Sequence, residues 1–399
     1  MNRRQFLVAA AVAGLSPWAA AGRGGLAEAG SLPVAAIQAV LDAAVSDDGL
    51  PGLVFGALTP RGNFLGAAGK ADLAAPRAME PGDQIRLASI TKNMTAALIL
   101  RLCEEGLLST GDILAALLPD CGVPNAASIT VAQLLNHTAG VYDHEESTDL
   151  DILSPGNFTK DWTAAEILAI SNAHGPAFAP GAQWGYSNTG YYLLGLIAEK
   201  RTGQTFEAAI AQRFFRPLGL ARTAVSRTGA LAAPLTGGYC LVADGDFRVM
   251  TDWNMSWDWT AGSGVSTAAD MLAWGRALFT GKLLSAASLA VMTTPTGKAA
   301  DIIPGQVGYG CGTEVWTADE FFGQPCWSHG GGNGGTRTFL LHYPRAWRTL
   351  FIGANRFDYA PAGVDATALV KNVLTALVPY LDFPAPTAVP AVNGLLFDA

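Results

Sequence analysis

Three short patterns in this chain contain residue types that can together cleave an amide or an ester. In the first, Ser89 and Lys92 lie three positions apart at the start of a segment with helical periodicity, so their side chains share one helix face. A serine hydroxyl is a poor nucleophile unless a neighbouring base takes its proton, and a lysine serves when a dry or positive environment lowers its pKa. The motif alone is weak, because a capping serine followed by a surface lysine gives the same pattern.

The other two patterns follow in the chain, and each of the three occurs once. Tyr-Ser-Asn stands at residues 186–188, just before a predicted helix, and His-Gly-Gly at residues 329–331 lies on a predicted strand that continues into more glycine. Glycine lets a substrate approach the backbone closely, and a strand edge can donate a backbone N–H to an oxyanion. The three patterns together favour acyl transfer through a serine.

The elements that position these residues follow from the periodicity of apolar residues. Residues 34–46 predict a helix, and residues 53–68 predict a hairpin with a turn after Pro60. Helical stretches dominate from about residue 81 to 234. Short strands return after Leu235, among them one over 308–317, and an amphipathic helix is predicted near the end, over 364–380.

We therefore predict an α/β (α+β) fold, in which one antiparallel sheet is built from both ends of the chain and flanked by the N- and C-terminal helices. The domain spans residues 34–382. Its α/β part is 34–80 and 235–382, and its helical part, 81–234, is a large insertion with a ligand-binding cleft beside the sheet. Residues 383–399 form a Pro-rich tail.

The composition of the chain limits the classes of partner that it can bind. Half of the 399 residues are hydrophobic and 15% are charged, which suits a large folded core. The net charge is −8 and no basic run is present, so no nucleic-acid partner is expected.

The N-terminus predicts export. Arg3 and Arg4 form a twin-arginine pattern, which leads into a short apolar run and then small residues at 19–21. We expect residues 1–21 to be a twin-arginine signal peptide and the protein to be periplasmic or secreted. The apolar run is about half the ~20 residues of a membrane-spanning helix, so no stable span is expected, with an uncleaved anchor as the alternative.

Five cysteines are too few for a disulfide scaffold. Cys311 and Cys326 are a candidate pair in an oxidising compartment, and Cys103 and Cys121 a weaker one. The alternative for all five, which include Cys240, is that they are small buried apolar side chains.

With its three ordered motifs, the chain resembles the serine β-lactamase and penicillin-binding-protein superfamily. The resemblance is to the group of class C β-lactamases, D-alanyl-D-alanine carboxypeptidases and family VIII esterases, and it runs from about residue 34 to 380. Further phrases that match this group are found at residues 134–140, 262–271 and 309–312.

The resemblance implies a role for each motif residue. Ser89 is the acylated nucleophile, and Lys92 takes or relays its proton. Tyr186 is the base or the proton shuttle to the leaving group, while Asn188 positions the substrate and Lys92. His329 is the fourth catalytic residue, in the place where β-lactamases usually carry the lysine of Lys-Thr-Gly.

The glycines of the third motif belong to the substrate-binding strand. Backbone N–H groups of Ser89 and Gly332 are expected to form the oxyanion hole, with Gly331 beside them. The resemblance implies a small-molecule or peptide substrate, namely a D-amino-acid peptide, a β-lactam or an ester. It implies no cofactor and no metal, and we expect a monomer.

The chain departs from the family at places that bear on the substrate. Related carboxypeptidases often hold the substrate's carboxylate with hydroxyl residues, where this chain has Gly330 and Gly332, so a carboxylate site would need another residue such as Arg337. We predict a serine hydrolase of the D-alanyl-D-alanine carboxypeptidase or esterase type. The alternatives are a class C-type β-lactamase and a penicillin- or peptidoglycan-binding sensor that does not turn over.

Other features carry less weight. His-Glu-Glu at residues 144–146 could suggest a metal, but a solvated loop is favoured, because no second ligand pair has suitable spacing. His137, at a predicted helix end, is interpreted as structural. Trp253, Trp257 and Trp259 either line the cleft or pack in the core, and core packing is favoured.

Overall fold

The computed structural model describes residues 31–46, 49–75, 77–150, 155–227, 235–241, 247–296, 306–316, 324–358 and 366–383. The chain from Leu32 onward forms one compact unit. The predicted signal peptide and the tail after Phe383 lie outside the described residues, so both stay predictions. Among the residues that are described, we find no helix with the length and apolarity needed to cross a membrane.

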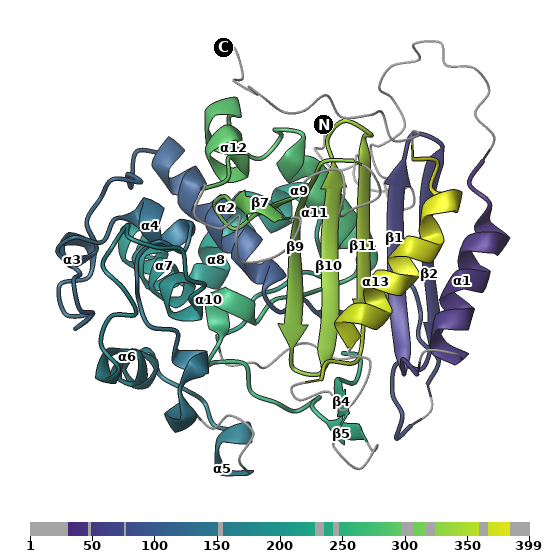
Figure 1. Cartoon of the computed structure of the whole chain (residues 1–399), viewed down its shortest axis with the longest axis horizontal. Coiled ribbons are helices and arrows are strands. Elements are labelled where there is room, and N and C mark those ends of the chain that lie inside the picture. Colours follow the sequence, from purple (N-terminus) through teal and green to yellow (C-terminus); the bar gives the residue numbers. More distant parts are fainter. Residues whose placement is uncertain are drawn as a thin grey trace, which may run out of the picture. The chain divides into compact units, whose positions relative to one another are not determined.

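Seven described strands form an antiparallel sheet in the order β2-β1-β11-β10-β9-β8-β7 (Figure 1). Their bounds are β1 Gly52–Thr59, β2 Gly62–Gly69, β7 Gln306–Tyr309, β8 Glu314–Trp316, β9 Cys326–Asn333, β10 Thr336–Tyr343 and β11 Arg348–Ala354. Leu53 of β1 pairs with Ala354 of β11, which joins the two ends of the chain. The predicted fold class, a sheet built from both ends, is therefore confirmed.

The two faces of the sheet bury different helices, because side chains alternate along each strand. Leu53 and Phe55 pack in a core with α1 (Val34–Ser46) and α13 (Ala366–Leu377), which cross the same face in Figure 1. Val54 instead belongs to the core shared with the helical region. That second core includes α11 (Ala268–Phe279), which packs against β11, β1 and β10.

The helical region lies beside β9 (Figure 1) and carries Ser89, Lys92, Tyr186 and Asn188, whereas the sheet carries the other predicted site residues. The helices of this region are α2 Ile90–Glu104, α3 Leu114–Leu117, α4 Val131–Leu135, α5 Pro155–Phe158, α6 Ala164–Ala173, α7 Asn188–Thr202, α8 Phe206–Ile210 and α9 Arg216–Leu218, and two later helices, α10 Trp259–Gly262 and α12 Ala286–Thr293, come from the second α/β part of the chain. The described elements also include three short 3-10 helices, η1 (His144–Glu146), η2 (Thr148–Leu150) and η4 (Val378–Tyr380), and a π-helical segment, η3 (Ala211–Phe215). Two small antiparallel pairs complete them, β3 (Ile85–Arg86) with β6 (Val265–Ser266) and β4 (Tyr239–Leu241) with β5 (Phe247–Val249).

Local sequence explains why the main helices begin and end where they do. The side chain of Ser187 caps α7 by accepting a hydrogen bond from Gly190 N, and α7 ends at Gly203, whose left-handed φ of 65° suits glycine. Helix α6 begins at a capping box formed by Thr163 and Glu166. Both helices lie within residues 81–234, the stretch that the sequence predicts to be mainly helical.

Two expectations about elements are wrong. The single strand predicted over 308–317 is a hairpin of β7 and β8, because the chain turns at Gly312, which has a φ of 62°. Helix α12 is missed by the periodicity, since seven of its eight residues are not buried and it lacks a clear apolar stripe.

The expected disulfide pairs are also absent. All five cysteines are free thiols. Cys311 packs in the core shared with the helical region and Cys326 in the core under α1 and α13, so the sheet separates this pair. The alternative, small buried apolar side chains, holds for these two and for Cys240, whereas Cys103 and Cys121 are half-buried. The predicted core packing of Trp253, Trp257 and Trp259 is confirmed, since each is at most 1% exposed.

Candidate active site

Ser89 stands immediately before α2, and Lys92 lies in its first turn. Nζ of Lys92 is 3.1 Å from Oγ of Ser89 and donates to the carbonyl oxygen of Ala261 at 2.9 Å. Ser89 occupies the N-cap position but makes no side-chain capping bond, and Lys92 is fully buried. The alternative of a capping serine and a surface lysine is therefore wrong.

The backbone before Ser89 is fixed from the neighbouring strands. Thr338 Oγ1 donates to the carbonyl of Leu87 at 2.8 Å, and Thr336 Oγ1 donates to that of Arg86 at 3.2 Å. Both threonines lie on β10, so their side chains reach past β9 to the serine segment. A Cβ at Gly331 would stand 2.1 Å from the Leu87 oxygen. Glycine is thus required there for β9 to approach the start of α2.

Tyr186 joins this pair from the loop before α7. Nζ of Lys92 lies 4.8 Å from the centroid of the Tyr186 ring. Burial raises the pKa of Tyr186 well above its usual value, and a hydrogen bond with Ser89 opposes that rise. Burial also lowers the pKa of Lys92, while nearby carboxyl groups oppose the shift. The structure brings Ser89, Lys92 and Tyr186 together, as the motifs predict.

His329 lies on β9 at a position that shares a face with Gly331, but its ring is enclosed. Nε2 is 2.8 Å from the hydroxyl of Tyr309, and Nδ1 is 2.6 Å from the carbonyl oxygen of Gly330. Burial lowers the pKa of His329, so the ring is neutral, accepts from the tyrosine and donates to the carbonyl. Tyr309 was missed as a site residue, although it begins the phrase at 309–312.

The remaining residues predicted to bind substrate are placed differently. Strand β8 pairs with β9 only as far as Ser328. Among the described residues, the part of β9 that follows Ser328 and carries Gly332 therefore has no strand partner on the β8 side. Arg337 lies on the opposite face of β10 from Thr338, with its guanidinium 4.5 Å from the Phe339 ring centroid. The structure does not bring Arg337 to Ser89, and an oxyanion role for Gly332 stays a prediction.

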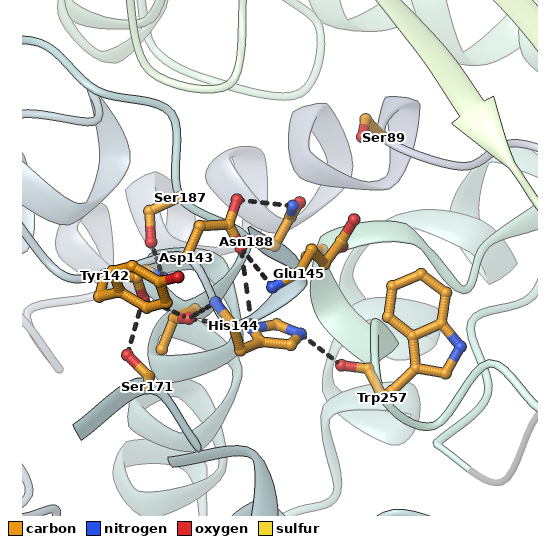
Figure 2. A network of polar contacts seen from close by, with 12 residues as sticks. Ser89, Tyr142, Asp143, His144, Glu145, Ser171, Ser187, Asn188 and Trp257 are labelled. Carbon is orange, nitrogen blue, oxygen red and sulfur yellow. Dashed lines mark hydrogen bonds and ion pairs between the residues drawn. The ribbon is translucent and has the colours of Figure 1, made fainter. Parts of the chain in front are cut away.

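Three carboxyl groups, those of Asp143, Glu145 and Asp258, lie close enough to Lys92 to interact with its charge. We call them the acidic group. Asn188 Nδ2 donates to Asp143 Oδ2 at 2.9 Å, so the predicted substrate-positioning asparagine holds this group (Figure 2). Asn333, at the end of β9, donates to Asp258. Asp143 and Asp258 are buried, whereas the Glu145 side chain reaches solvent.

The acidic group is electrostatically unusual. Burial raises the pKa of Asp258 to about 7, and burial also raises that of Asp143. The pKa of Glu145 is raised well above its usual value. The largest cause is the protein that surrounds its carboxyl group, and the nearby Asp258 and Asp143 add to the rise. All three interact with Lys92, which they favour in its charged form. The site therefore carries more carboxyl groups than its single lysine can neutralise.

Sequence reasoning overlooked the acidic group because it interpreted residues 144–146 as either metal ligands or, preferably, a solvated loop. His144 is fully buried, with Nε2 3.0 Å from the Trp257 carbonyl and Nδ1 2.9 Å from Thr189 Oγ1. The solvated loop expected there is therefore wrong for His144. Within the described part of the chain, no group of three suitable side chains is placed to hold a metal ion. The available signal was the pair of acidic residues that flank His144.

Fold and site together define a β-lactamase/transpeptidase-like protein. The Beta-lactamase family model matches residues 37–375, so the chain belongs to this family. Penicillin-binding protein 4* of Bacillus subtilis (strain 168) is 27% identical over 72% of this chain and 64% of its own length, so the chain spans less than two thirds of that relative.

Two solved structures are similar over most of both chains. A D-stereospecific amidohydrolase from a Streptomyces species is 31% identical, with a TM-score of 0.74 over 85% of this chain and 97% of its own. The D-amino acid amidase of Ochrobactrum anthropi SV3, in complex with L-phenylalanine amide, is 28% identical, with a TM-score of 0.75 over 87% and 97%. Family and neighbours together indicate a hydrolase, in agreement with the resemblance seen in the sequence.

Proposed function

We propose that this protein is a serine hydrolase that cleaves an amide bond next to a free ammonium group, with D-amino acid amides as its substrate class. The observation that carries the proposal is the position of the acidic group around Lys92 at the Ser89 site. An ammonium group that binds there gains charge-assisted hydrogen bonds and favours the ionised carboxylates. The proposal is supported by the two similar structures, of which one is a D-stereospecific amidohydrolase and the other a D-amino acid amidase that holds L-phenylalanine amide.

The reaction proceeds through an acyl-enzyme. Oγ of Ser89 attacks the carbonyl carbon while Lys92, 3.1 Å away, accepts its proton. Tyr186 relays that proton to the leaving nitrogen, so the C–N bond breaks and ammonia or an amine departs. A water molecule that gives its proton to the same pair then attacks the ester and restores Ser89. Backbone N–H groups of Ser89 and Gly332 stabilise the oxyanion.

The acidic group argues against substrates with a carboxylate near the scissile bond. Both D-alanyl-D-alanine peptides and β-lactams carry one, and at the acidic group it would face carboxyl groups in place of a cationic partner. Arg337, the predicted carboxylate partner, lies on the other face of the sheet. Carboxypeptidase and β-lactamase activity are thus less well supported than cleavage of an amino acid amide, and esters of amino acids remain compatible.

The test compares two amides that differ only in the ammonium group. D-phenylalanine amide and 3-phenylpropanamide share the leaving group and the side chain, so the ratio of their kcat/KM values isolates recognition of the ammonium. We expect a ratio above about 10, since a hydrogen bond to a charged group contributes ~1.5–3 kcal/mol. Nitrocefin, a D-alanyl-D-alanine peptide and L-phenylalanine amide complete the panel.

A matched pair of variants locates the effect. Glu145→Gln should lower the ratio by about tenfold. Glu146→Gln, which changes an adjacent exposed carboxylate, should leave the ratio unchanged. Equal turnover of the two amides, or a preference for the peptide or nitrocefin, would overturn the proposed substrate class. One equivalent of product per protein, with no further turnover, would instead support the sensor.

Export and the monomeric state rest on the sequence and belong to this proposal. Twin lysines in place of Arg3 and Arg4 should keep the full chain in the cytoplasm if the signal is of the twin-arginine type. Cell fractionation with and without this change tests the location, and light scattering of the purified protein tests the oligomeric state.

A further inference from the structure

His137, interpreted from the sequence as structural, contacts the residues on both sides of Tyr186. Its carbonyl oxygen accepts a hydrogen bond from Gly185 N at 2.9 Å, and its Nδ1 accepts one from Ser187 N at 3.1 Å. The ring itself lies against Tyr186, with the two centroids 4.4 Å apart and the planes tilted by 35°. His137 therefore contacts Tyr186, the predicted proton shuttle, and also the residue on each side of it.

The conformation of His137 suits this task. Its φ of 61° is left-handed, a region that non-glycine residues rarely adopt and histidine tolerates better than most. His137 follows α4, and this turn presents its carbonyl and its ring to the same loop. A residue that served only to end the helix would need no ring contact with Tyr186.

The surroundings keep the ring neutral and in one tautomer. His137 is 2% exposed, and Nδ1 is an acceptor, so the proton is on Nε2. Nε2 has no hydrogen-bond partner, and the rings of Tyr309 and Tyr191 lie 4.7 and 5.1 Å away. Burial, then Lys92 and His329, lower its pKa well below the usual value. A protonated His137 would lose the acceptor for Ser187 N.

We propose that His137 is a positioning residue for Tyr186, which holds the phenol at the angle needed to deliver a proton to the leaving group. The inference rests on the proposed role of Tyr186 and adds a residue to it. A proton matters most when the leaving group is a poor one. An amine must be protonated as it departs, whereas p-nitrophenolate leaves without a proton. Loss of His137 should therefore slow amide cleavage more than cleavage of an activated ester.

The experiment uses two substrates with one acyl group, D-phenylalanine amide and D-phenylalanine p-nitrophenyl ester. The readout is the amide-to-ester ratio of kcat/KM, which reports on steps up to acylation. Tyr186→Phe sets the reference loss. His137→Phe keeps a ring but removes the acceptor, and we expect it to lower the ratio about tenfold or more, part of the 10²–10⁴ that proton transfer contributes. His137→Asn, which tolerates left-handed φ and has an acceptor oxygen, should restore part of the ratio.

His342→Phe is the matched control. His342 is also buried, stacks on Trp327 and Phe279, and bonds Thr349 Oγ1 at 2.9 Å, but it lies on β10 outside the Ser89 cluster. It should change the melting temperature and leave the ratio unchanged.

Two outcomes would overturn the inference. They differ in whether the proposed role of Tyr186 also fails. If Tyr186→Phe lowers the ratio and both folded His137 variants do not, the positioning role alone fails. If Tyr186→Phe leaves the ratio unchanged, the shuttle role of Tyr186 fails and that of His137 with it. Should His137→Phe not fold, His137→Asn decides by the same ratio, which must then lie between the wild-type and Tyr186→Phe values.

Discussion

The side-chain amide of Asn333 donates a hydrogen bond to the carboxyl group of Asp258. Asn333 ends the strand that carries His329, and Asp258 directly precedes α10, whose Ala261 carbonyl accepts from Lys92. The contact therefore connects the sheet to the acidic group. It also depends on Gly262, where a Cβ would stand 1.7 Å from Asp258 Oδ2.

The raised pKa of Asp258 predicts a pH-dependent stability. Its folded value of about 7 lies above 3.8, so the folded protein holds this proton more tightly, and the resulting stabilisation is lost as pH rises from about 4 through 7. Asp258→Asn does not titrate. Its free energy of unfolding relative to wild type should rise across that window, by at most about 4 kcal/mol, and level off above it. Urea unfolding at pH 4, 5.5, 7 and 8 measures this; parallel profiles would contradict it.

Ser89→Ala should abolish turnover, because it removes the hydroxyl that lies 3.1 Å from Nζ of Lys92. We expect kcat to fall at least about 10³-fold, with unchanged melting. Labelling by a fluorescent penicillin or a fluorophosphonate, read by intact mass, should also disappear. Ser46→Ala, at the exposed end of α1, serves as the control. Labelling of Ser89→Ala at the wild-type rate would mean that the nucleophile is another residue.

Gly331→Ala should damage stability and activity together. Its Cβ would lie 2.1 Å from the Leu87 oxygen, which belongs to the backbone and cannot rotate away. We expect a loss of ~1–3 kcal/mol in the free energy of unfolding and of about 10² in kcat/KM, because β9 and Ser89 must move apart. Gly82→Ala, with open space around its Cα, is the control for both measurements. A fully active Gly331→Ala would show that this approach is not needed.

Thiol titration tests the cysteines. The unfolded protein without reductant should give five reactive thiols, since all five are free. In the folded protein we expect slow reaction, because burial raises the pKa of Cys103 to about 11 and that of Cys311 to about 12. A count of three after unfolding would contradict this and show that one disulfide is present.

Elements with strong local signals were predictable from the sequence. The nearly continuous apolar runs of β1 and β11 and the helical spacing of α13 report on burial, and burial of both sheet faces is what the fold requires. Ser89 and Lys92 were predictable because they lie three positions apart on one helix face. Tyr186 was predictable only from the family resemblance, since no local spacing connects it to them.

The rest depends on contacts between distant segments. Asp258 meets Asn333 across 75 positions, and Tyr309 meets His329 only because the β7–β8 hairpin folds back. No local pattern marks such pairs. For the same reason the sequence could not show that Arg337 faces away from Ser89, since the face of a strand depends on its register with its neighbours.

The pairing of Leu53 with Ala354 has a consequence for how the molecule folds. The two residues are about 300 positions apart, and contacts of this separation close late and slowly. Strand β1 gains its neighbour β11 only after about 300 further residues have been synthesised, and Ser89 gains β9 only after about 240. During this part of its synthesis the nascent chain carries the nucleophile without the strand that completes its site.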